Sequence, residues 1–411
     1  MGFYPTASGP AKVAPMTGQR LSEVLDGALA PCLDQLLTPA LVIDLDAVQA
    51  NIAATIARVG GEDRWRPHLK TSKQAVIIDL MLDAGLRHFK VATCDELGLL
   101  LRTAGSRAVD VLFCYPAQRA SLTAVLALAR AHAHARVLVL ADSPAHLDAI
   151  AAWSRALGHT SPLPVMLDVD LGMHRTGSIP AEWRERPSVP EPLVLAGLHG
   201  YDGHLTWAQR EQAQLGYDAL VELATALCSG PAAPAPSTLE LVTSGTHSYA
   251  HALDHPGLRA GAWRHSVSPG TIVLSDRRSH AAERDIGLRQ AAFVATRVIS
   301  AGPDRVTLDA GSKAIAPDVS PPSCAIVDHG ELEPQRASEE HLPCRVQPGA
   351  ASPELGRLLW LIPEHVCTTV NLYREAVWIR GGRYVGVGPV GASGHGCGLP
   401  DTSLVKPPRE G

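Results

Sequence analysis

Apolar runs alternate with helical stretches along the first part of the chain. Between residues 38 and 245, short runs of β-branched and apolar residues are separated by Ala- and Leu-rich segments with the apolar period of a helix. The predicted strands are Leu41–Leu45, Trp65–Leu69, Phe89–Ala92, Val109–Tyr115, Val137–Ala141, Pro164–Val169, Leu193–Leu198 and Leu239–Val242. The clearest predicted helices between them are Asp46–Arg58, Lys73–Asp83, Asp95–Thr103 and Ser121–His132. Eight strand–helix units predict a (β/α)8 TIM-like barrel, with an open doubly wound sheet as the alternative.

The pattern changes after residue 275. Further runs read as strands separated by Gly and Pro turns, with little helix between them. They are Val294–Ile299, Val306–Asp309, Ala325–Val327, Leu358–Ile362, Ala376–Ile379 and Tyr384–Val387. We therefore predict an α/β fold with the barrel over residues 38–275 and a C-terminal β domain over residues 276–411. Residues 1–37 are expected to form an N-terminal arm that packs on the β domain.

Length and composition narrow the class of protein. A chain of 411 residues with 46% hydrophobic residues can bury the cores of a barrel and of a smaller second domain. The net charge is −5 and the basic residues form no stripe, which argues against binding to nucleic acid. No apolar run reaches the roughly 18 residues of a membrane span. The first 20 residues lack the apolar core of a signal peptide, and the eight scattered cysteines form no C-x-x-C pair, so we expect a cytoplasmic protein.

Reactive side chains follow several of the predicted strands. Because the C-terminal ends of barrel strands meet at one mouth, Lys70, Arg175, Tyr201 and the turn Ser244-Gly245-Thr246 are expected to converge there. A lysine in such a mouth is partly desolvated, which lowers its pKa and favours Schiff-base chemistry. The Ser-Gly-Thr turn offers backbone N–H groups and hydroxyls to a phosphate. A surface lysine that caps a strand, and an ordinary turn, are the alternatives.

A possible metal site lies near the C-terminus, in the segment Gly394–Gly398. His395 and Cys397 are two residues apart, so on an extended segment their side chains face the same way. His and Cys together suit Zn²⁺, and two protein ligands would leave open positions for catalysis. A Gly-rich turn with an incidental His and Cys is the alternative. His365 and Cys367 repeat the spacing, but they lie beside a predicted strand and are interpreted as structural.

Together these motifs resemble the D-threonine aldolase/D-serine dehydratase family, whose members are fold-type III pyridoxal-phosphate (PLP) enzymes with an alanine-racemase-like barrel. The resemblance covers residues 38 to 400 and rests on Thr38–Asp44, Arg66–Thr71, Lys90–Thr93 with Glu96, Asp168–Gly172 with Arg175, Tyr201 with Gly203, Ser244–Thr246, Pro363–Cys367 with Asn371 and Leu372, and His395 with Cys397. Ser72 stands where the family's lysine motif usually continues with a histidine, and the phosphate turn is poorer in glycine than is usual.

The resemblance implies a role for each motif. Lys70 would carry PLP as a Schiff base, with Arg175 and Tyr201 beside the cofactor. The phosphate would lie at Ser244, Gly245 and Thr246. His395 and Cys397 would hold a divalent metal, with Zn²⁺ expected and Mn²⁺ or Mg²⁺ left open.

The resemblance further implies a lyase that acts on a D-amino acid with a 3-hydroxyl group. A D-serine dehydratase-like enzyme would eliminate water and give a keto acid and ammonia, and D-3-hydroxyaspartate is a further possible substrate. A D-threonine aldolase-like enzyme would give glycine and an aldehyde, with His204 or a metal-bound water as base. The His-x-Cys pair favours the dehydratase, as in the family's dehydratases, and thiolate prefers Zn²⁺. An amino-acid racemase on the same fold would need no metal, so the His-x-Cys pair argues against it. A non-enzymatic PLP-binding protein would resemble a bare barrel and would explain neither the metal pair nor the β domain. Family members also imply a homodimer.

Overall fold

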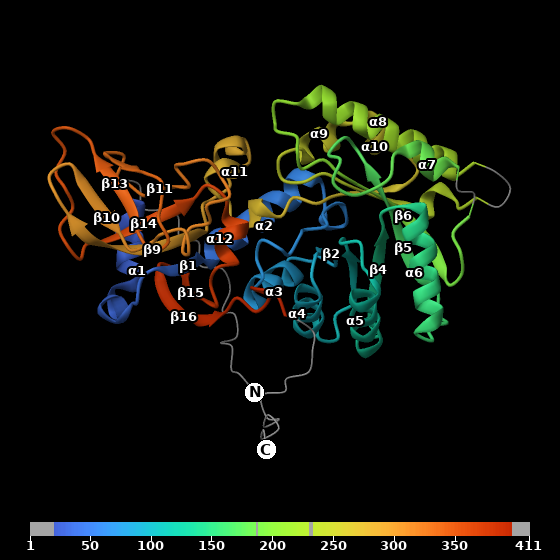
Figure 1. Cartoon of the computed structure of the whole chain (residues 1–411), viewed down its shortest axis with the longest axis horizontal. Coiled ribbons are helices and arrows are strands. Elements are labelled where there is room, and N and C mark those ends of the chain that lie inside the picture. Colours follow the sequence, from blue (N-terminus) through green and yellow to red (C-terminus); the bar gives the residue numbers. More distant parts are fainter. Residues whose placement is uncertain (1–19, 186–187, 230–232, 397–411) are drawn as a thin grey trace, which may run out of the picture.

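The computed structural model describes residues 20–185, 188–229 and 233–396. A barrel of alternating strands and helices stands beside a domain built mostly of strands, and α2 (Leu45–Val59) runs between the two (Figure 1). The parallel sheet of the barrel contains, in spatial order, β2 (His88–Val91), β3 (Val109–Phe113), β4 (Ala135–Ala141), β5 (Leu163–Asp170), β6 (Leu193–Tyr201), β7 (Glu240–Thr243) and β8 (Arg264–Val267). Its helices are α3 (Ala75–Asp83), α4 (Cys94–Ala104), α5 (Arg119–Ala131), α6 (Pro144–Ala156), α7 (Pro180–Arg184), α8 (Arg210–Leu227), α9 (Tyr249–Asp254) and α10 (Pro256–Ala260).

The segment that precedes Lys70 closes this sheet into a barrel. Trp65 forms a parallel bridge with Val267 on β8, and His68 forms one with Lys90 on β2. The N–H of Leu69 also donates to the Lys90 carbonyl at 2.9 Å. The two outer strands of the seven-stranded sheet are thus joined through residues 65–69. The predicted barrel is confirmed, and Lys70 follows directly on its closing strand.

Two strands differ from the prediction. Leu41–Leu45 was predicted as the first barrel strand, but β1 (Ala40–Asp44) pairs antiparallel with β9 (Ala292–Ala301) and parallel with β15 (Glu375–Arg380) in the second sheet. The missing barrel strand is β8, which the apolar pattern did not predict because it is four residues long and begins with Arg264 and His265. The barrel therefore starts with the Trp65 segment, and the Ser244-Gly245-Thr246 turn follows its seventh strand, β7.

The second sheet has nine strands and packs against α1 (Leu21–Leu29). Its remaining strands are β10 (Arg305–Leu308), β11 (Cys324–Ile326), β12 (Leu332–Pro334), β13 (Leu342–Val346), β14 (Leu358–Pro363) and β16 (Arg383–Pro389). Two short helices, α11 (Arg277–Ala282) and α12 (Val366–Val370), lie between this sheet and the barrel (Figure 1). Leu25 and Leu29 of α1 are buried in one cluster with Phe293 and Trp360.

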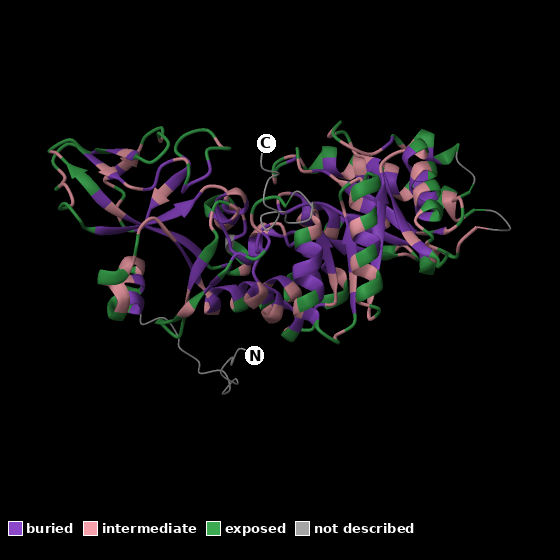
Figure 2. Ribbon diagram, turned by 60° about the horizontal axis from the view of Figure 1, so that its bottom comes forward, coloured by how far each residue is buried: buried purple, intermediate pink, exposed green. Residues whose placement is uncertain are grey.

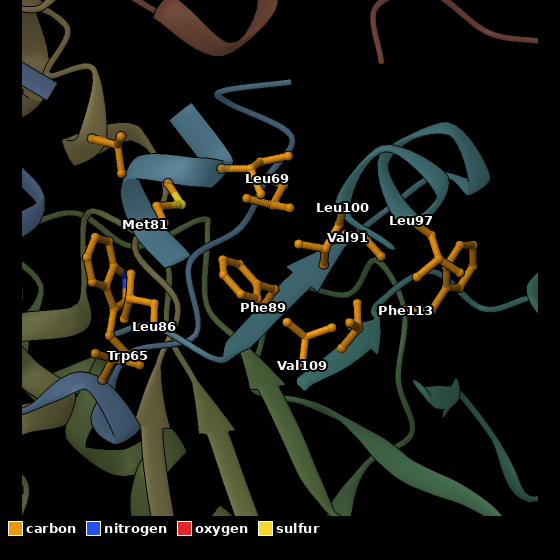
Figure 3. Packing of buried hydrophobic residues seen from close by; sticks show 14 of the residues in the cluster. Trp65, Leu69, Met81, Leu86, Phe89, Val91, Leu97, Leu100, Val109 and Phe113 are labelled. Atoms are coloured by element: carbon orange, nitrogen blue, oxygen red, sulfur yellow. The ribbon is translucent and has the colours of Figure 1, made fainter. Parts of the chain in front are cut away.

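Burial follows the strands and the inner faces of the helices (Figure 2). Phe89 on β2 is fully buried beside Trp65 and Val91 (Figure 3), and burying one such aromatic contributes about 1.5–3 kcal/mol. Local signals fix the helix that follows β2, because the Thr93 hydroxyl accepts from the N–H of Glu96 and caps α4. None of the described helices is long and apolar enough to cross a membrane.

Candidate active site

A cavity of about 290 Å³ lies at the C-terminal ends of the barrel strands. Side chains from the barrel and from the β domain share its wall, among them Lys70, Lys90, Tyr201, His365 and Cys367. This is the end of the barrel at which catalytic groups gather in this architecture. Of the residues predicted from the strand ends, Lys70, Tyr201, Gly245 and Thr246 line the cavity, and Arg175 lies against the Tyr201 ring. The β domain closes the cavity from the other side.

His68 fixes the start of the turn that carries Lys70. Its Nδ1 accepts a hydrogen bond from the N–H of Lys70 at 3.2 Å, so the ring proton resides on Nε2, which faces the Cys114 sulfur at 3.3 Å. Burial, followed by the charges of Lys70 and Lys90, holds the pKa of His68 well below its usual value. A neutral histidine thus sets the direction in which Lys70 leaves the strand.

The pKa of Lys70 shifts in the direction opposite to the prediction. Burial is the largest single influence and would lower the pKa of its ammonium group, as predicted. Tyr201, Cys367 and Cys114 outweigh burial and raise the pKa of Lys70 above its usual value. The prediction of a lowered pKa was therefore wrong, because it counted desolvation and omitted these three acidic neighbours.

Tyr201, at the end of β6, is the centre of the site. The guanidinium carbon of Arg175 lies 4.8 Å from its ring centroid, and the Nζ of Lys70 lies 5.7 Å away. Two glycines make room for the ring: a Cβ on Gly203 would lie 2.3 Å from its hydroxyl oxygen, and one on Gly245 would lie 2.9 Å from Cε2. Gly203 and Gly245 are therefore required because their backbones approach the flat ring of Tyr201 closely.

The predicted phosphate turn is held from both sides. Ser244 is buried with a φ of 63°, and the hydroxyl of Thr246 accepts from the N–H groups of Gly270 and Thr271 at 3.3 and 3.2 Å. Ser248, just beyond the turn, donates to the buried carboxylate of Asp202 at 2.5 Å. The turn after β7 is therefore bonded to the turn after β8.

The turn after β8 supplies residues that the sequence analysis left without a role. The hydroxyl of Ser268 is buried, lines the cavity and has no hydrogen-bond partner among the described residues. A Cβ on Gly270 would lie 2.7 Å from the carbonyl oxygen of His68, so only glycine fits there. Because the first predicted barrel strand was misplaced, β8 and its turn were not recognised as part of the mouth.

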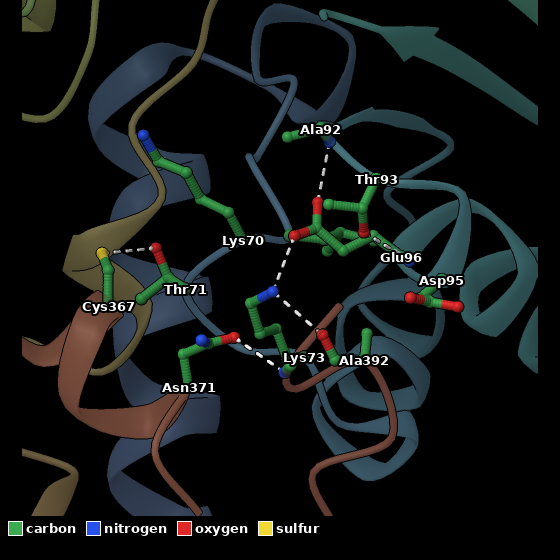
Figure 4. Close-up of polar contacts among 12 residues, drawn as sticks. Lys70, Thr71, Lys73, Ala92, Thr93, Asp95, Glu96, Cys367, Asn371 and Ala392 are labelled. Atoms are coloured by element: carbon green, nitrogen blue, oxygen red, sulfur yellow. Dashed lines mark hydrogen bonds and ion pairs between the residues drawn. The ribbon is translucent and has the colours of Figure 1, made fainter. Parts of the chain in front are cut away.

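His365 and Cys367 enter the cavity from the start of α12. The Cys367 sulfur lies 3.1 Å from the Thr71 hydroxyl oxygen (Figure 4) and 3.4 Å from that of Thr271. Burial raises the pKa of the thiol, but the hydrogen bond and charge of His365 outweigh it, so the pKa of Cys367 lies below its usual value. The hydrogen bond to Cys367, acting against burial and supported by Asp318, raises the pKa of His365 to about 9.

The interpretation of His365 and Cys367 as structural does not agree with this position. The Nδ1 of His365 faces the carboxylate of Asp318, which leaves its Nε2 for the side of Cys367. A histidine oriented by a carboxylate, next to a thiol, is a common donor arrangement for zinc. The signal was present in the sequence, because the pair directly follows the buried strand β14, and strand ends had located the other site residues.

Of the other predicted pair, only His395 lies within the described residues. His395 is exposed and does not line the cavity, and its neighbours Gly394 and Gly396 donate backbone N–H groups to Asn371 and Asp95 at 3.3 and 3.4 Å. Cys397 lies outside the described residues. His204, suggested as a base, is exposed and lines the cavity.

A buried ion pair attaches the segment after β16 to the barrel (Figure 4). The Nζ of Lys73 donates to Glu96 at 3.0 Å and to the carbonyl of Ala392 at 2.9 Å. Glu96 also accepts the N–H of Ala92 at 2.8 Å. Lys73 has a φ of 51°, so the turn that begins at Lys70 ends in a constrained left-handed residue. The two domains are therefore joined within three residues of Lys70.

These residues fit PLP. Half-buried Lys70 would form the Schiff base, a tyrosine ring and an arginine lie beside it, and the unpartnered Ser268 hydroxyl is free to meet a polar atom of the cofactor. The bonded turns after β7 and β8, with glycines where a Cβ would clash, offer a close backbone approach to the phosphate.

Comparisons with known proteins agree with this geometry. Residues 43–229 match the family model "Alanine racemase, N-terminal domain", and residues 291–379 match "Putative serine dehydratase domain". A D-threonine aldolase from an Arthrobacter species is 27% identical over 380 residues, covering 87% of this chain and 93% of its own. A D-threo-3-hydroxyaspartate dehydratase from a Delftia species is 35% identical over 141 residues, which is 34% of this chain and 35% of the dehydratase.

Solved structures show the same fold. The D-threonine aldolase of Filomicrobium marinum superposes with a TM-score of 0.72 at 23% identity, covering 87% of this chain and 95% of the aldolase. The Delftia dehydratase superposes with a TM-score of 0.70 at 24% identity, covering 86% and 97%. Fold and site together define a fold-type III PLP enzyme. The matches support a PLP-dependent lyase that resembles the D-threonine aldolase/D-serine dehydratase family, as the sequence motifs indicated.

Proposed function

We propose that this protein is a PLP- and divalent-metal-dependent lyase that eliminates water from a D-3-hydroxy amino acid, in the manner of a D-serine dehydratase. The observation that carries the proposal is the meeting of Lys70, His365 and Cys367 at one cavity. A dehydratase needs a base near Cα and an electrophile near the 3-hydroxyl group, and these side chains would supply the base and the ligands of the electrophile. The products would be a keto acid and ammonia.

We propose His365 and Cys367 as the metal ligands in place of His395 and Cys397. Both line the cavity beside Lys70, whereas His395 is exposed outside it. Within the described ranges no group of three or more His, Cys, Asp and Glu side chains is arranged to hold a metal. A metal at the pair would therefore complete its shell with water or substrate, as a catalytic metal requires. Thiolate with imidazole favours Zn²⁺ over Mn²⁺ or Mg²⁺.

Each residue then has a task. PLP, when bound, supplies an electron sink for negative charge at Cα. Lys70, which would hold the cofactor, would also serve as the base for the Cα proton of the substrate. Tyr201 and Arg175 would hold the cofactor. Ser244, Gly245 and Thr246, in the turn after β7, would bind its phosphate beside the turn after β8. A metal on His365 and Cys367 would act as a Lewis acid on the 3-hydroxyl group.

Retro-aldol cleavage to glycine and an aldehyde is the second candidate. It requires a base for the 3-hydroxyl proton, and exposed His204 on the cavity wall supports it. The long alignment with the Arthrobacter D-threonine aldolase supports it as well. The thiol of Cys367 favours the dehydratase because it makes a soft metal site.

A product assay separates the two candidates. Purified protein with PLP and Zn²⁺ is given D-serine, D-threonine or D-threo-3-hydroxyaspartate, and keto acid, ammonia, glycine and aldehyde are measured. We expect keto acid and ammonia in equal amounts, and loss of both after treatment with a chelator. Glycine with aldehyde would replace the dehydratase proposal by the aldolase. Activity that is unchanged by metal removal would overturn the metal assignment. We also propose a homodimer, which light scattering of the holoenzyme would test.

A further inference from the structure

A second lysine lies in the floor of the cavity. Lys90, on β2, is 2% exposed and lines the cavity. Its ammonium group has no hydrogen-bond or ion-pair partner among the described residues, and its nearest recorded contact is the Tyr201 ring, whose centroid is 5.3 Å away. Buried ammonium groups are normally paired, so this group is placed to meet an anion that comes from outside the chain.

The surrounding charges do not supply that anion. Lys70 and Arg175 are cations around the same tyrosine ring, and His68 is held neutral. The carboxylate of Asp168 is bonded to His199 at 2.6 Å. Burial is the main cause that lowers the pKa of Lys90 to about 8; Lys70 and Arg175 add to it, whereas Cys114 and Asp168 oppose it. Burial also raises the pKa of the Cys114 thiol, which therefore supplies no anion either. The part of the cavity around Lys90 therefore carries more positive than negative charge.

The order of the strands indicates which anion fits. The phosphate turns follow β7 and β8, Lys70 follows the closing strand next to β8, and Lys90 lies on β2, the next strand around the barrel. In the pyridine ring of PLP, the phosphate arm, the aldehyde carbon and the phenolic 3-oxygen occupy consecutive carbons. The substituents of the ring and the residues around the barrel thus follow the same order.

We propose that Lys90 binds the phenolic 3-oxygen of PLP and holds it as the phenolate. This inference rests on the PLP site of the proposed function and extends it by one residue. Lys90 is a cofactor-binding residue in this view, because it lies in the wall of the cavity beside Tyr201. A charge-assisted hydrogen bond to the phenolate would also orient the ring toward Lys70.

The test is a double-mutant cycle between the protein and the cofactor. Affinities for PLP and for 3-deoxypyridoxal 5′-phosphate, which lacks only the 3-oxygen, are measured by equilibrium dialysis with wild type, Lys90→Met and Lys90→Arg. Lys313→Met, a change at an exposed lysine of the β domain, is the matched control. The preference for PLP over 3-deoxypyridoxal 5′-phosphate should be about 10- to 100-fold larger in wild type and the control than in Lys90→Met. Lys90→Arg should regain part of this preference.

Absorption gives an independent readout. The yellow band of the bound cofactor should fall in Lys90→Met relative to the near-ultraviolet band, because loss of the cation disfavours the phenolate. Equal preference for the two cofactors in wild type and Lys90→Met, with unchanged bands, would overturn the inference. An effect of Lys90→Met only on the KM of the substrate would also overturn it and would assign Lys90 to a substrate carboxylate. If Lys90→Met does not fold, the loss of preference is read from Lys90→Arg. Failure of wild type to bind PLP at all would refute the cofactor site itself.

Discussion

The sulfur of Cys367 lies 3.1 Å from the hydroxyl of Thr71, the residue that follows Lys70. Cys367 belongs to the β domain and Thr71 to the barrel, so this contact crosses from one domain to the other. The proposed metal ligands and the lysine are thereby brought to one cavity, although almost 300 residues separate them in the chain. Lys73 and Glu96 provide a second connection close by.

Replacing Lys70 tests the lysine assignment directly. Lys70→Ala is expected to lose the yellow band of the bound cofactor and at least about a thousandfold in turnover, because no other group forms the covalent link. Absorption after addition of PLP and a product assay measure both effects. A variant that keeps the band and the turnover would show that another residue holds the cofactor.

Metal content distinguishes the two His-x-Cys pairs. Cys367→Ala and His365→Ala are expected to weaken zinc binding by at least about 100-fold, since loss of an outer partner already costs about 10- to 100-fold. Asp318→Asn should weaken zinc binding by the smaller factor of about 10- to 100-fold, because Asp318 only orients His365. His395→Ala is the matched control and should keep its zinc, as measured by atomic spectroscopy after dialysis. Loss of zinc in His395→Ala alone would restore the pair predicted from the sequence.

The buried ion pair of Lys73 should contribute to stability. Lys73→Met leaves the carboxylate of Glu96 buried without its cation, and breaking one partner of such a pair costs about 3–5 kcal/mol. The free energy of unfolding of the apoprotein in urea measures the loss. Lys313→Met removes an exposed pair and should leave the unfolding midpoint unchanged. Equal losses of unfolding free energy in Lys73→Met and Lys313→Met would contradict the expectation that the buried Lys73–Glu96 pair contributes more than an exposed pair.

Acid should destabilise the fold through His265. Burial, followed by the charges of Arg64 and His255, lowers the pKa of His265 to about 3, against 6.5 in the unfolded chain. The unfolded state therefore binds more protons between these values, and stability is lost as the pH falls below about 6.5. At pH 5 the contribution is about 2 kcal/mol.

A substitution at His265 isolates this contribution. His265→Gln retains a partner for the Thr243 hydroxyl, which now lies 2.8 Å from the ring. Urea unfolding of the apoprotein at pH 7 and pH 5 should show a smaller decrease for His265→Gln than for wild type. Parallel decreases would mean that other groups cause the acid sensitivity.

Local signals in the sequence were sufficient for most elements. The predicted helices Asp46–Arg58, Lys73–Asp83, Asp95–Thr103 and Ser121–His132 end within two residues of α2, α3, α4 and α5. Apolar period and caps act over a few residues, so they can be seen without the fold. The rule that barrel strands end at one mouth then predicts from the sequence that Lys70, Arg175, Tyr201 and the Ser244 turn lie near one another.

The sequence by itself thus determined the barrel and the strand-rich domain, and it led to the proposal of Lys70 as the cofactor lysine. Only the tertiary structure decided that β1 pairs with β9 and β15, that β8 completes the barrel, and that Cys367 rather than exposed His395 lies beside Lys70. An apolar run indicates that a strand is buried, but it does not indicate which strand pairs with it. The two His-x-Cys spacings have the same local chemistry, and long-range packing brings His365 and Cys367 to the cavity.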